Sequence, residues 1–145
     1  MQQTKYCAGF AFGPDDTVVL IQKIKPKWQA GKFNGIGGKI EPNESPAEAQ
    51  VREFEEETGV KITNWKLFAT VIYPEATVYF HKTTIELGEL NNLQSVTDEL
   101  VEPFWIHSLP LNIISNLRWL IPLALDSRNE NYTIIVNAWE NSIGD

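Results

Sequence analysis

Short runs rich in β-branched and aromatic residues recur along the chain and predict strands. The first two runs, 5–12 and 17–24, flank Gly13-Pro14-Asp15-Asp16, whose composition is typical of a turn, so they predict a hairpin. Further strands are expected at 62–73, 77–87, 101–107 and 132–139. The intervening segment 25–39 is basic, aromatic and glycine-rich, which predicts a loop at the sheet edge.

A helix is predicted to begin after Ser45, because Pro46 occupies the first helical position and Glu48 completes a capping box. It should end at Thr58, since Gly59 is a good C-cap residue. At roughly 100° per residue, the stripe predicted to pack consists of Ala47, Val51, Phe54 and Thr58. A different arc, about 100° wide, carries Glu53, Glu56 and Glu57, and Glu55 lies outside it and should be exposed.

A second helix is expected over 113–125, with Asn112 as a possible N-cap and Pro122 as a kink or break. The chain of 145 residues has the length of one domain and contains no repeat or linker. Strands mixed with helices then predict a single α/β domain over residues 1–145.

The net charge of −7 argues against binding to a nucleic-acid polymer, which needs a basic surface. The acids are unevenly spread, and seven of the nineteen fall between residues 41 and 60, namely Glu41, Glu44, Glu48, Glu53, Glu55, Glu56 and Glu57. Such a density repels itself unless a cation is bound there. The alternative is an ordinary solvated acidic helix face.

Cys7 is the only cysteine, which excludes an intrachain disulfide and is typical of a reducing compartment. The N-terminal residues lead directly into strand-like sequence without an apolar signal segment, and no apolar run has the roughly 18 residues of a membrane span. We therefore expect a cytoplasmic protein without a membrane partner, either a monomer or a homodimer.

One pattern joins the acidic cluster to fixed glycines: Gly38, five residues, Glu44, seven residues, then Arg52-Glu53-Phe54-Glu55-Glu56-Glu57-Thr58-Gly59-Val60. It resembles the box of the Nudix hydrolases, and no fixed position departs from it. The resemblance implies an α/β/α sandwich, with a mixed curved sheet between helices. It also implies hydrolysis of a nucleoside diphosphate linkage with Mg²⁺, for which Mn²⁺ can substitute.

The spacing suits that chemistry, because attack on an anionic phosphate needs a cation that neutralises charge and activates water. Mg²⁺ binds hard oxygen ligands. The predicted ligands are the Glu53, Glu56 and Glu57 carboxylates, at i, i+3 and i+4, and the Gly38 carbonyl. Glu53 can alternatively orient the attacking water.

Arg52 is expected to hold a carboxylate in place by a charged hydrogen bond, and Glu44 to act structurally. Family members commonly carry a further acid on a loop before a late strand. In this chain Glu99 is the better match and Glu102 competes with it, and either can serve as the general base.

The stretch Phe33-Asn34-Gly35-Ile36-Gly37-Gly38-Lys39 is similar to that of the MutT-like branch, which hydrolyses oxidised purine nucleoside triphosphates. There the asparagine reads the base, so Asn34 either pairs with a purine or simply adopts a left-handed turn before Gly35. Further candidate substrate contacts are Lys23 and Lys39 for phosphate and Trp28 and Trp119 for stacking, although Trp119 equally suits the core.

The sequence departs from the animal type of this branch near the second helix, where Ile113, Ser115 and Asn116 replace a tryptophan and two aspartates. Base selectivity therefore does not transfer. The first interpretation is hydrolysis of a nucleoside triphosphate, for example an oxidised purine deoxynucleotide, to monophosphate and pyrophosphate. The alternatives are hydrolysis of ADP-ribose or a dinucleotide polyphosphate, and a non-catalytic nucleotide-binding module.

Overall fold

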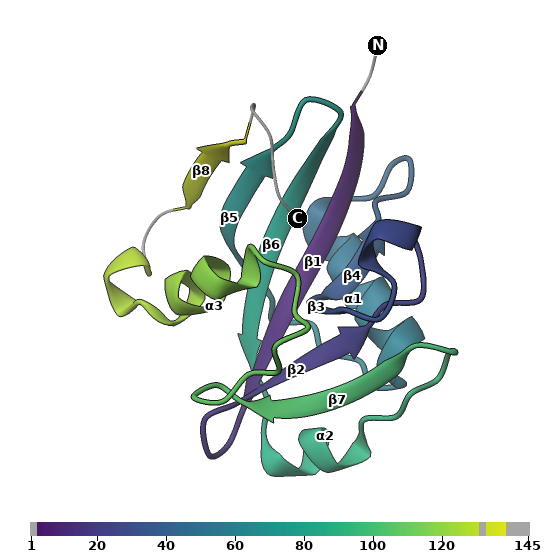
Figure 1. Cartoon of the computed structure of the whole chain (residues 1–145), viewed down its shortest axis with the longest axis vertical. Coiled ribbons are helices and arrows are strands. Elements are labelled where there is room, and N and C mark those ends of the chain that lie inside the picture. Colours follow the sequence, from purple (N-terminus) through teal and green to yellow (C-terminus); the bar gives the residue numbers. More distant parts are fainter. Residues whose placement is uncertain (1–2, 131–132, 139–145) are drawn as a thin grey trace.

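The computed structural model describes residues 3–130 and 133–138 (Figure 1). Its strands are β1 (Thr4–Gly13), β2 (Thr17–Gln22), β3 (Phe33–Asn34), β4 (Ile36–Lys39), β5 (Lys66–Ile72), β6 (Ala76–Thr84), β7 (Leu100–Trp105) and β8 (Ile134–Asn137). The helices are α1 (Pro46–Thr58), α2 (Leu87–Asn92) and α3 (Leu117–Leu125), with 3-10 turns η1 (Lys27–Gln29) and η2 (Ser127–Asn129). No helix in the described ranges is long and apolar enough to cross a bilayer.

The strands form one mixed sheet in the order β3-β2-β1-β6-β5-β8. The centre of the sheet is a parallel pair, β1 with β6. On its other edge β1 has two antiparallel partners in succession: its first half pairs with β4 and its last residues pair with β2. Strand β7 then pairs with β2. The mixed sheet between helices that the sequence predicts is confirmed.

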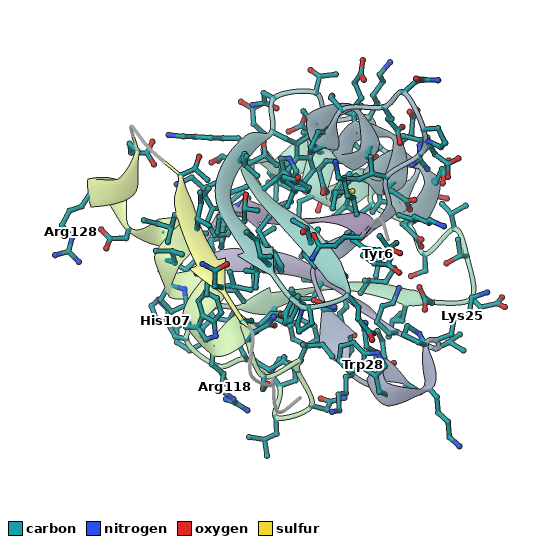
Figure 2. The ribbon with its side chains drawn as sticks, turned by 90° about the horizontal axis from the view of Figure 1, so that it is seen from above. Tyr6, Lys25, Trp28, His107, Arg118 and Arg128 are labelled. Atoms are coloured by element: carbon teal, nitrogen blue, oxygen red, sulfur yellow. The ribbon has the colours of Figure 1, made fainter. Side chains whose placement is uncertain are left out.

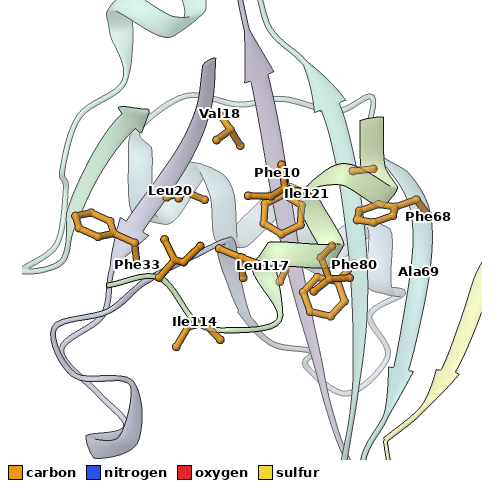
Figure 3. Packing of buried hydrophobic residues seen from close by; sticks show 14 of the residues in the cluster. Phe10, Val18, Leu20, Phe33, Phe68, Ala69, Phe80, Ile114, Leu117 and Ile121 are labelled. Carbon is orange, nitrogen blue, oxygen red and sulfur yellow. The ribbon is translucent and has the colours of Figure 1, made fainter. Parts of the chain in front are cut away.

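Helices α1 and α3 lie on opposite faces of this sheet (Figure 1). The side chains of β1 alternate accordingly: Phe10 joins the core on the α3 side, which is drawn in Figure 3, and Ala11 joins the core on the α1 side. On the α3 side the rings of Phe10 and Phe80 stack, with centroids 6.2 Å apart, beneath Leu117 and Ile121. The core on the α1 side joins Phe54 of α1 to Ile36 of β4, so it fixes α1 against the part of the sheet that contains β4.

Helix α1 begins and ends as the sequence predicts. Ser45 Oγ accepts a hydrogen bond from the Glu48 backbone amide at 3.0 Å, and the Glu48 side chain accepts one from the Ser45 backbone amide at 2.8 Å. Gly59 closes the helix with a φ of 80°, a left-handed conformation that favours glycine. The boundaries therefore follow from local side-chain chemistry.

The predicted packing stripe of α1 is only partly right. Ala47 is exposed and Val51 half-buried, whereas the buried residues are Ala49, Gln50, Phe54 and Thr58. The buried face is rotated because Gln50 enters the core, where its Nε2 donates to the Ile36 carbonyl at 2.9 Å. Gly9 on β1 makes room for it, since a Cβ there would lie 2.3 Å from that nitrogen.

The prediction of a loop over 25–39 is wrong for most of its length, because this segment contains η1, β3 and β4. A glycine-rich sequence forms strand β4 because the backbones approach closely: a Cβ on Gly37 would lie 2.0 Å from the Cys7 carbonyl oxygen. Gly35 alone separates β3, which pairs with β2, from β4, which pairs with β1. The chain thus steps from one strand partner to another within a single residue.

The second predicted helix starts later than expected. Helix α3 begins at Leu117 with Asn116 at the N-cap, so Asn112 is not its cap, and Pro122 lies inside the helix without ending it. Residues before it are held by β3, since Ile113 forms a parallel bridge with Phe33. Helix α2 was not predicted, and residues 62–65 lie outside β5. Strand β8 falls within the predicted 132–139, whose end residues lie outside the described ranges.

Strand β6 buries one titratable side chain on the α1 side of the sheet, His81, which is 1% exposed. Burial lowers the pKa of this imidazole to about 4, so it stays neutral in the folded chain where an unfolded histidine, near 6.5, is charged. Because the unfolded chain takes up this proton first, we expect His81 to lower the free energy of unfolding by up to about 3 kcal/mol as the pH falls from about 6.5 to 4. Urea unfolding across this range measures the loss, and His81→Asn should flatten it; an unchanged slope would contradict the assignment.

Candidate active site

The acidic arc of α1 faces the end of β4. The side chains of Glu53 and Glu57 are half-buried, and that of Glu56 is 57% exposed. Burial is the main cause that raises the pKa of both Glu53 and Glu57, and the charge of Glu56 raises it further. Glu55 lies outside the arc and is exposed, as predicted. The arc therefore concentrates negative charge that the fold does not fully compensate.

Arg52 connects the arc to the preceding loop. Its guanidinium donates to both oxygens of Glu44, at 2.7 and 2.9 Å, in a bidentate pair. It also donates to Glu53 at 3.0 Å, to Glu56 at 3.4 Å and to the Lys39 carbonyl at 3.1 Å. The hydrogen bonds from Arg52 hold the pKa of Glu44 below its usual range. Arg52 thus fixes the positions of three carboxylates from one side chain.

Gly38 supports the expected cation chemistry by its lack of a side chain. A Cβ at this position would lie 2.5 Å from Glu53 Cδ, so a larger residue would displace this carboxylate from its place beside the β4 backbone. Within the described ranges, no three His, Cys, Asp or Glu side chains already stand at ion-holding spacing; the arc bonds to Arg52 and Thr97. The donor set consists of hard oxygens around uncompensated charge, which fits Mg²⁺.

The loop before β7 is bound both to the arc and to the residues that follow β2. Glu99 accepts hydrogen bonds from the Ile24 amide at 2.7 Å and from Lys23 Nζ at 3.2 Å, and its charge raises the pKa of Glu57. Thr97 Oγ1 donates to Glu57 Oε2 at 3.1 Å and accepts from the Glu99 amide. The sequence contains no pattern that marks Thr97, because this contact depends on how the loop folds back onto α1.

Glu102 has a different environment from Glu99. It lies within β7 opposite Leu20 of β2, and residues opposite each other share a face of the sheet. Leu20 belongs to the core on the α3 side. The structure therefore brings Glu99 and Lys23 to the carboxylate arc and directs Glu102 to the other face of the sheet.

A cavity of about 830 Å³ opens beside β4 on the α3 side of the sheet. Its lining includes Lys23, Trp28, Asn34, Gly37 and Gly38, together with Tyr6, Gln29, Tyr73 and Asn116. Figure 2 labels two of its aromatic residues, Tyr6 and Trp28, the latter 54% exposed. Gly38 therefore belongs both to the cavity lining and to the part of β4 that lies next to the Glu53 carboxylate.

Two predicted substrate contacts lie outside this cavity. The Lys39 side chain is exposed at the end of β4, and its carbonyl accepts from Arg52. Trp119 lies in α3 and is 41% exposed, so it is neither part of the cavity lining nor a core residue. The alternative of a core position for Trp119 is therefore wrong.

Asn34 lies in β3 and does not adopt the left-handed conformation, which among described non-glycine residues is confined to Asp15, Asp16 and Asn43. The interpretation of Asn34 as a left-handed turn residue is therefore wrong. Its Oδ1 accepts from the Gly35 amide at 2.7 Å, and its Nδ2 donates to Gln29 Oε1 at 3.0 Å. Gln29 had no signal in the sequence, because it reaches Asn34 only through the 3-10 turn η1.

Comparison with known families decides what this combination of arc, glycine strand and cavity represents. The model of the NUDIX domain matches residues 5–119. The chain belongs to the Nudix family. Its members generally use divalent metal ions, typically Mg²⁺, and act on nucleotide substrates. The resemblance to the Nudix hydrolases stated from the sequence is confirmed.

The names of individual relatives refer to different bases, a pyrimidine in one case and an oxidised purine in another. The Nudix chain is 43% identical over 49 residues to CTP pyrophosphohydrolase of Escherichia coli, covering 34% of this chain and 36% of that protein. It is 33% identical over 66 residues to 8-oxo-dGTP diphosphatase of Proteus vulgaris, covering 46% and 59%. The chain thus spans between a third and three fifths of the length of these relatives.

The fold has a solved counterpart. The MutT NUDIX hydrolase from Burkholderia pseudomallei superposes with a TM-score of 0.70 at 23% identity, covering 85% of this chain and 97% of that one. At this identity the similarity establishes the Nudix fold and leaves the substrate to the site itself.

Proposed function

We propose that this Nudix chain hydrolyses a nucleoside triphosphate to the monophosphate and pyrophosphate with the help of Mg²⁺. The observation that carries the proposal is the shared position of Gly38, which lines the cavity on one side and contacts the Glu53 carboxylate on the other. A nucleotide whose base lies in the cavity directs its phosphates along β4 toward the acidic arc.

At the phosphate end, Glu53, Glu56 and Glu57 and the Gly38 carbonyl would hold the cation. When bound, Mg²⁺ neutralises phosphate charge and makes a nucleophile from water near neutral pH. Arg52 keeps Glu53 in place and prevents the arc from spreading under its own repulsion. Mn²⁺ can replace Mg²⁺ because it accepts the same oxygen ligands.

Glu99 is the proposed late acid, and it accepts the proton of the attacking water or adds a ligand to the cation. Its proximity to Glu57 and its anchorage by the Ile24 amide support this role. Lys23 contacts Glu99 and lines the cavity, so it compensates phosphate charge on the same side. Glu102 shares a face with Leu20 and receives no role here.

At the base end, Asn34 reads the base edge and Trp28 stacks on its ring. An oxidised purine deoxynucleotide is the first substrate to test, because the stretch around Asn34 is similar to that of the MutT-like branch. The relatives named for CTP and for 8-oxo-dGTP make a comparison between a pyrimidine and a purine the informative one. Lys39 and Trp119 receive no role, since neither lines the cavity.

The test is a phosphate-release screen, coupled to pyrophosphatase, of ordinary and oxidised triphosphates, ADP-ribose and diadenosine polyphosphates, with and without Mg²⁺. We expect turnover of triphosphates that requires the cation and is concentrated on few bases. Turnover restricted to ADP-ribose or dinucleotides would keep the Nudix reaction and reject the triphosphate assignment. Absence of Mg²⁺-dependent turnover with all of them would favour a nucleotide-binding module.

A further inference from the structure

The amide of Asn34 has only one possible orientation. A backbone N–H can only donate, so the atom that faces the Gly35 amide at 2.7 Å must be Oδ1. The remaining group, Nδ2, therefore faces Gln29, and the Gln29 atom that receives it at 3.0 Å must be Oε1. The hydrogen bonds thus run in one direction: the Gly35 backbone amide donates to the Asn34 side chain, which in turn donates to the Gln29 side chain.

The two ends of this series are held by the fold. Asn34 lies opposite Ile21 in the β3–β2 pair. Gln29 belongs to η1, where its backbone N donates to the Pro26 carbonyl and its carbonyl accepts from the Lys32 amide, both at 2.9 Å. The Gln29 side chain and Asn34 both line the cavity. The bond between them is therefore made by two anchored residues at the surface that would face the ligand.

After these bonds, Asn34 retains one N–H and one lone pair for a ligand, in a fixed order. With the Gly35 contact alone, the amide has a single anchor and can tilt about its terminal torsion, which is broad for asparagine. The Gln29 contact supplies the second anchor. A base held in the cavity must then present an acceptor opposite Nδ2 and a donor opposite Oδ1.

We propose that Gln29 is a positioning residue that determines base specificity by fixing the Asn34 amide. The proposal rests on the proposed function for its substrate class, a nucleotide read at a base edge with adjacent donor and acceptor. Gln29 acts through Asn34 and leaves the phosphate end unaffected, so it changes discrimination among bases more than it changes the reaction.

The experiment measures binding without hydrolysis, so that it is independent of the proposed reaction. AMP, GMP, CMP and UMP are titrated into the metal-free chain, and tryptophan fluorescence reports binding because Trp28 lines the cavity. The variants are Gln29→Leu, which removes the acceptor, and Gln29→Glu, whose carboxylate oxygen accepts the same bond. Gln94→Leu, at an exposed glutamine outside the cavity lining, is the matched control.

We expect the ratio of the largest to the smallest Kd among the four monophosphates to shrink by about 3- to 10-fold in Gln29→Leu, the range for loss of one hydrogen bond. Gln29→Glu should keep the wild-type ratio, because its added charge weakens all four monophosphates alike. Gln94→Leu should equal wild type. The proposal is overturned by an unchanged ratio in folded Gln29→Leu, by equal loss in Gln29→Glu, or by a wild-type chain that does not discriminate.

A second readout tests the bond itself. The Asn34 side-chain amide resonances in a ¹⁵N spectrum should shift in Gln29→Leu and stay near their wild-type positions in Gln29→Glu. Identical resonances in all three proteins would overturn the proposal. If discrimination is present while no triphosphate is hydrolysed, the proposed function fails and the role of Gln29 stands.

Discussion

Glu57→Gln is expected to lower kcat for the preferred triphosphate by about 10²–10⁴-fold, the loss typical of a positioned catalytic group. The amide has nearly the shape of the carboxylate but lacks the charge that holds a cation. The variant should keep the wild-type fold, because the side chain at position 57 is only half-buried and its partner, Thr97 Oγ1, can also donate to an amide oxygen. The measurement is steady-state kinetics in saturating Mg²⁺, with circular dichroism to verify folding.

The matched control for this variant is Glu55→Gln, which makes the same change on the same helix but on a side that does not belong to the arc. Glu55 is exposed, so its kcat should stay near wild type. A second readout is Mg²⁺ itself, which should raise the melting temperature of wild type and Glu55→Gln and do so less in Glu57→Gln. Near-normal turnover by Glu57→Gln would remove Glu57 from the proposed ligands.

Arg52→Met is expected to cost about 2–3 kcal/mol of unfolding free energy, because a bidentate charged pair with Glu44 and the bond to Glu53 disappear together. The Glu44 and Glu53 side chains are only 15% and 14% exposed, so solvent replaces the lost donors incompletely. Urea unfolding at neutral pH measures the loss. Arg52→Lys should recover part of it, since one ammonium cannot replace the planar fork.

The effect of Arg52→Met should depend on pH in a defined direction. Arg52 lowers the pKa of Glu44 in the folded chain, so this contribution is present above the usual glutamate pKa, near 4.5, and is lost as the pH falls. The difference between variant and wild type should therefore shrink in acid. The control is Arg128→Met, which removes an arginine that is 87% exposed and should remain close to wild type. Equal stabilities of Arg52→Met and Arg128→Met would contradict the structural role of Arg52.

The sequence predicts α1 and the arc well because both depend on local information. A capping box, a proline and a C-terminal glycine fix the helix within residues 45–59 whatever it packs against. Spacing within a known helix then fixes which glutamates share a side. The rotated packing face is the part that local information misses, since it depends on a buried glutamine that finds its partner on β4.

Elements that depend on distant partners were predicted poorly. Residues 36–39 have the composition of a loop and form a strand only because β1 offers them an edge. Residues 113–116 have helical periodicity, yet Ile113 pairs with Phe33 instead. Thr97 and Gln29 contact candidate site residues only after the fold brings them together, so no spacing in the sequence identifies them.

Because only Gly35 separates β3 from β4, the backbone fixes the distance between the two ends of the candidate site. Asn34 and Gly38 are four positions apart in the sequence, or roughly 13 Å of extended chain. Both ends are tied to the sheet, Asn34 by β2 and Gly38 by β1, so this length cannot adjust. A Cβ on Gly35 would lie 3.0 Å from the Phe10 ring and 3.1 Å from the Gly9 carbonyl, so a larger residue between the two strands would have to displace its neighbours. If the proposed function holds, substitution of side chains can change which base enters the cavity, whereas the main chain from Asn34 to Gly38 sets which phosphate bond, counted from that base, meets the acidic arc.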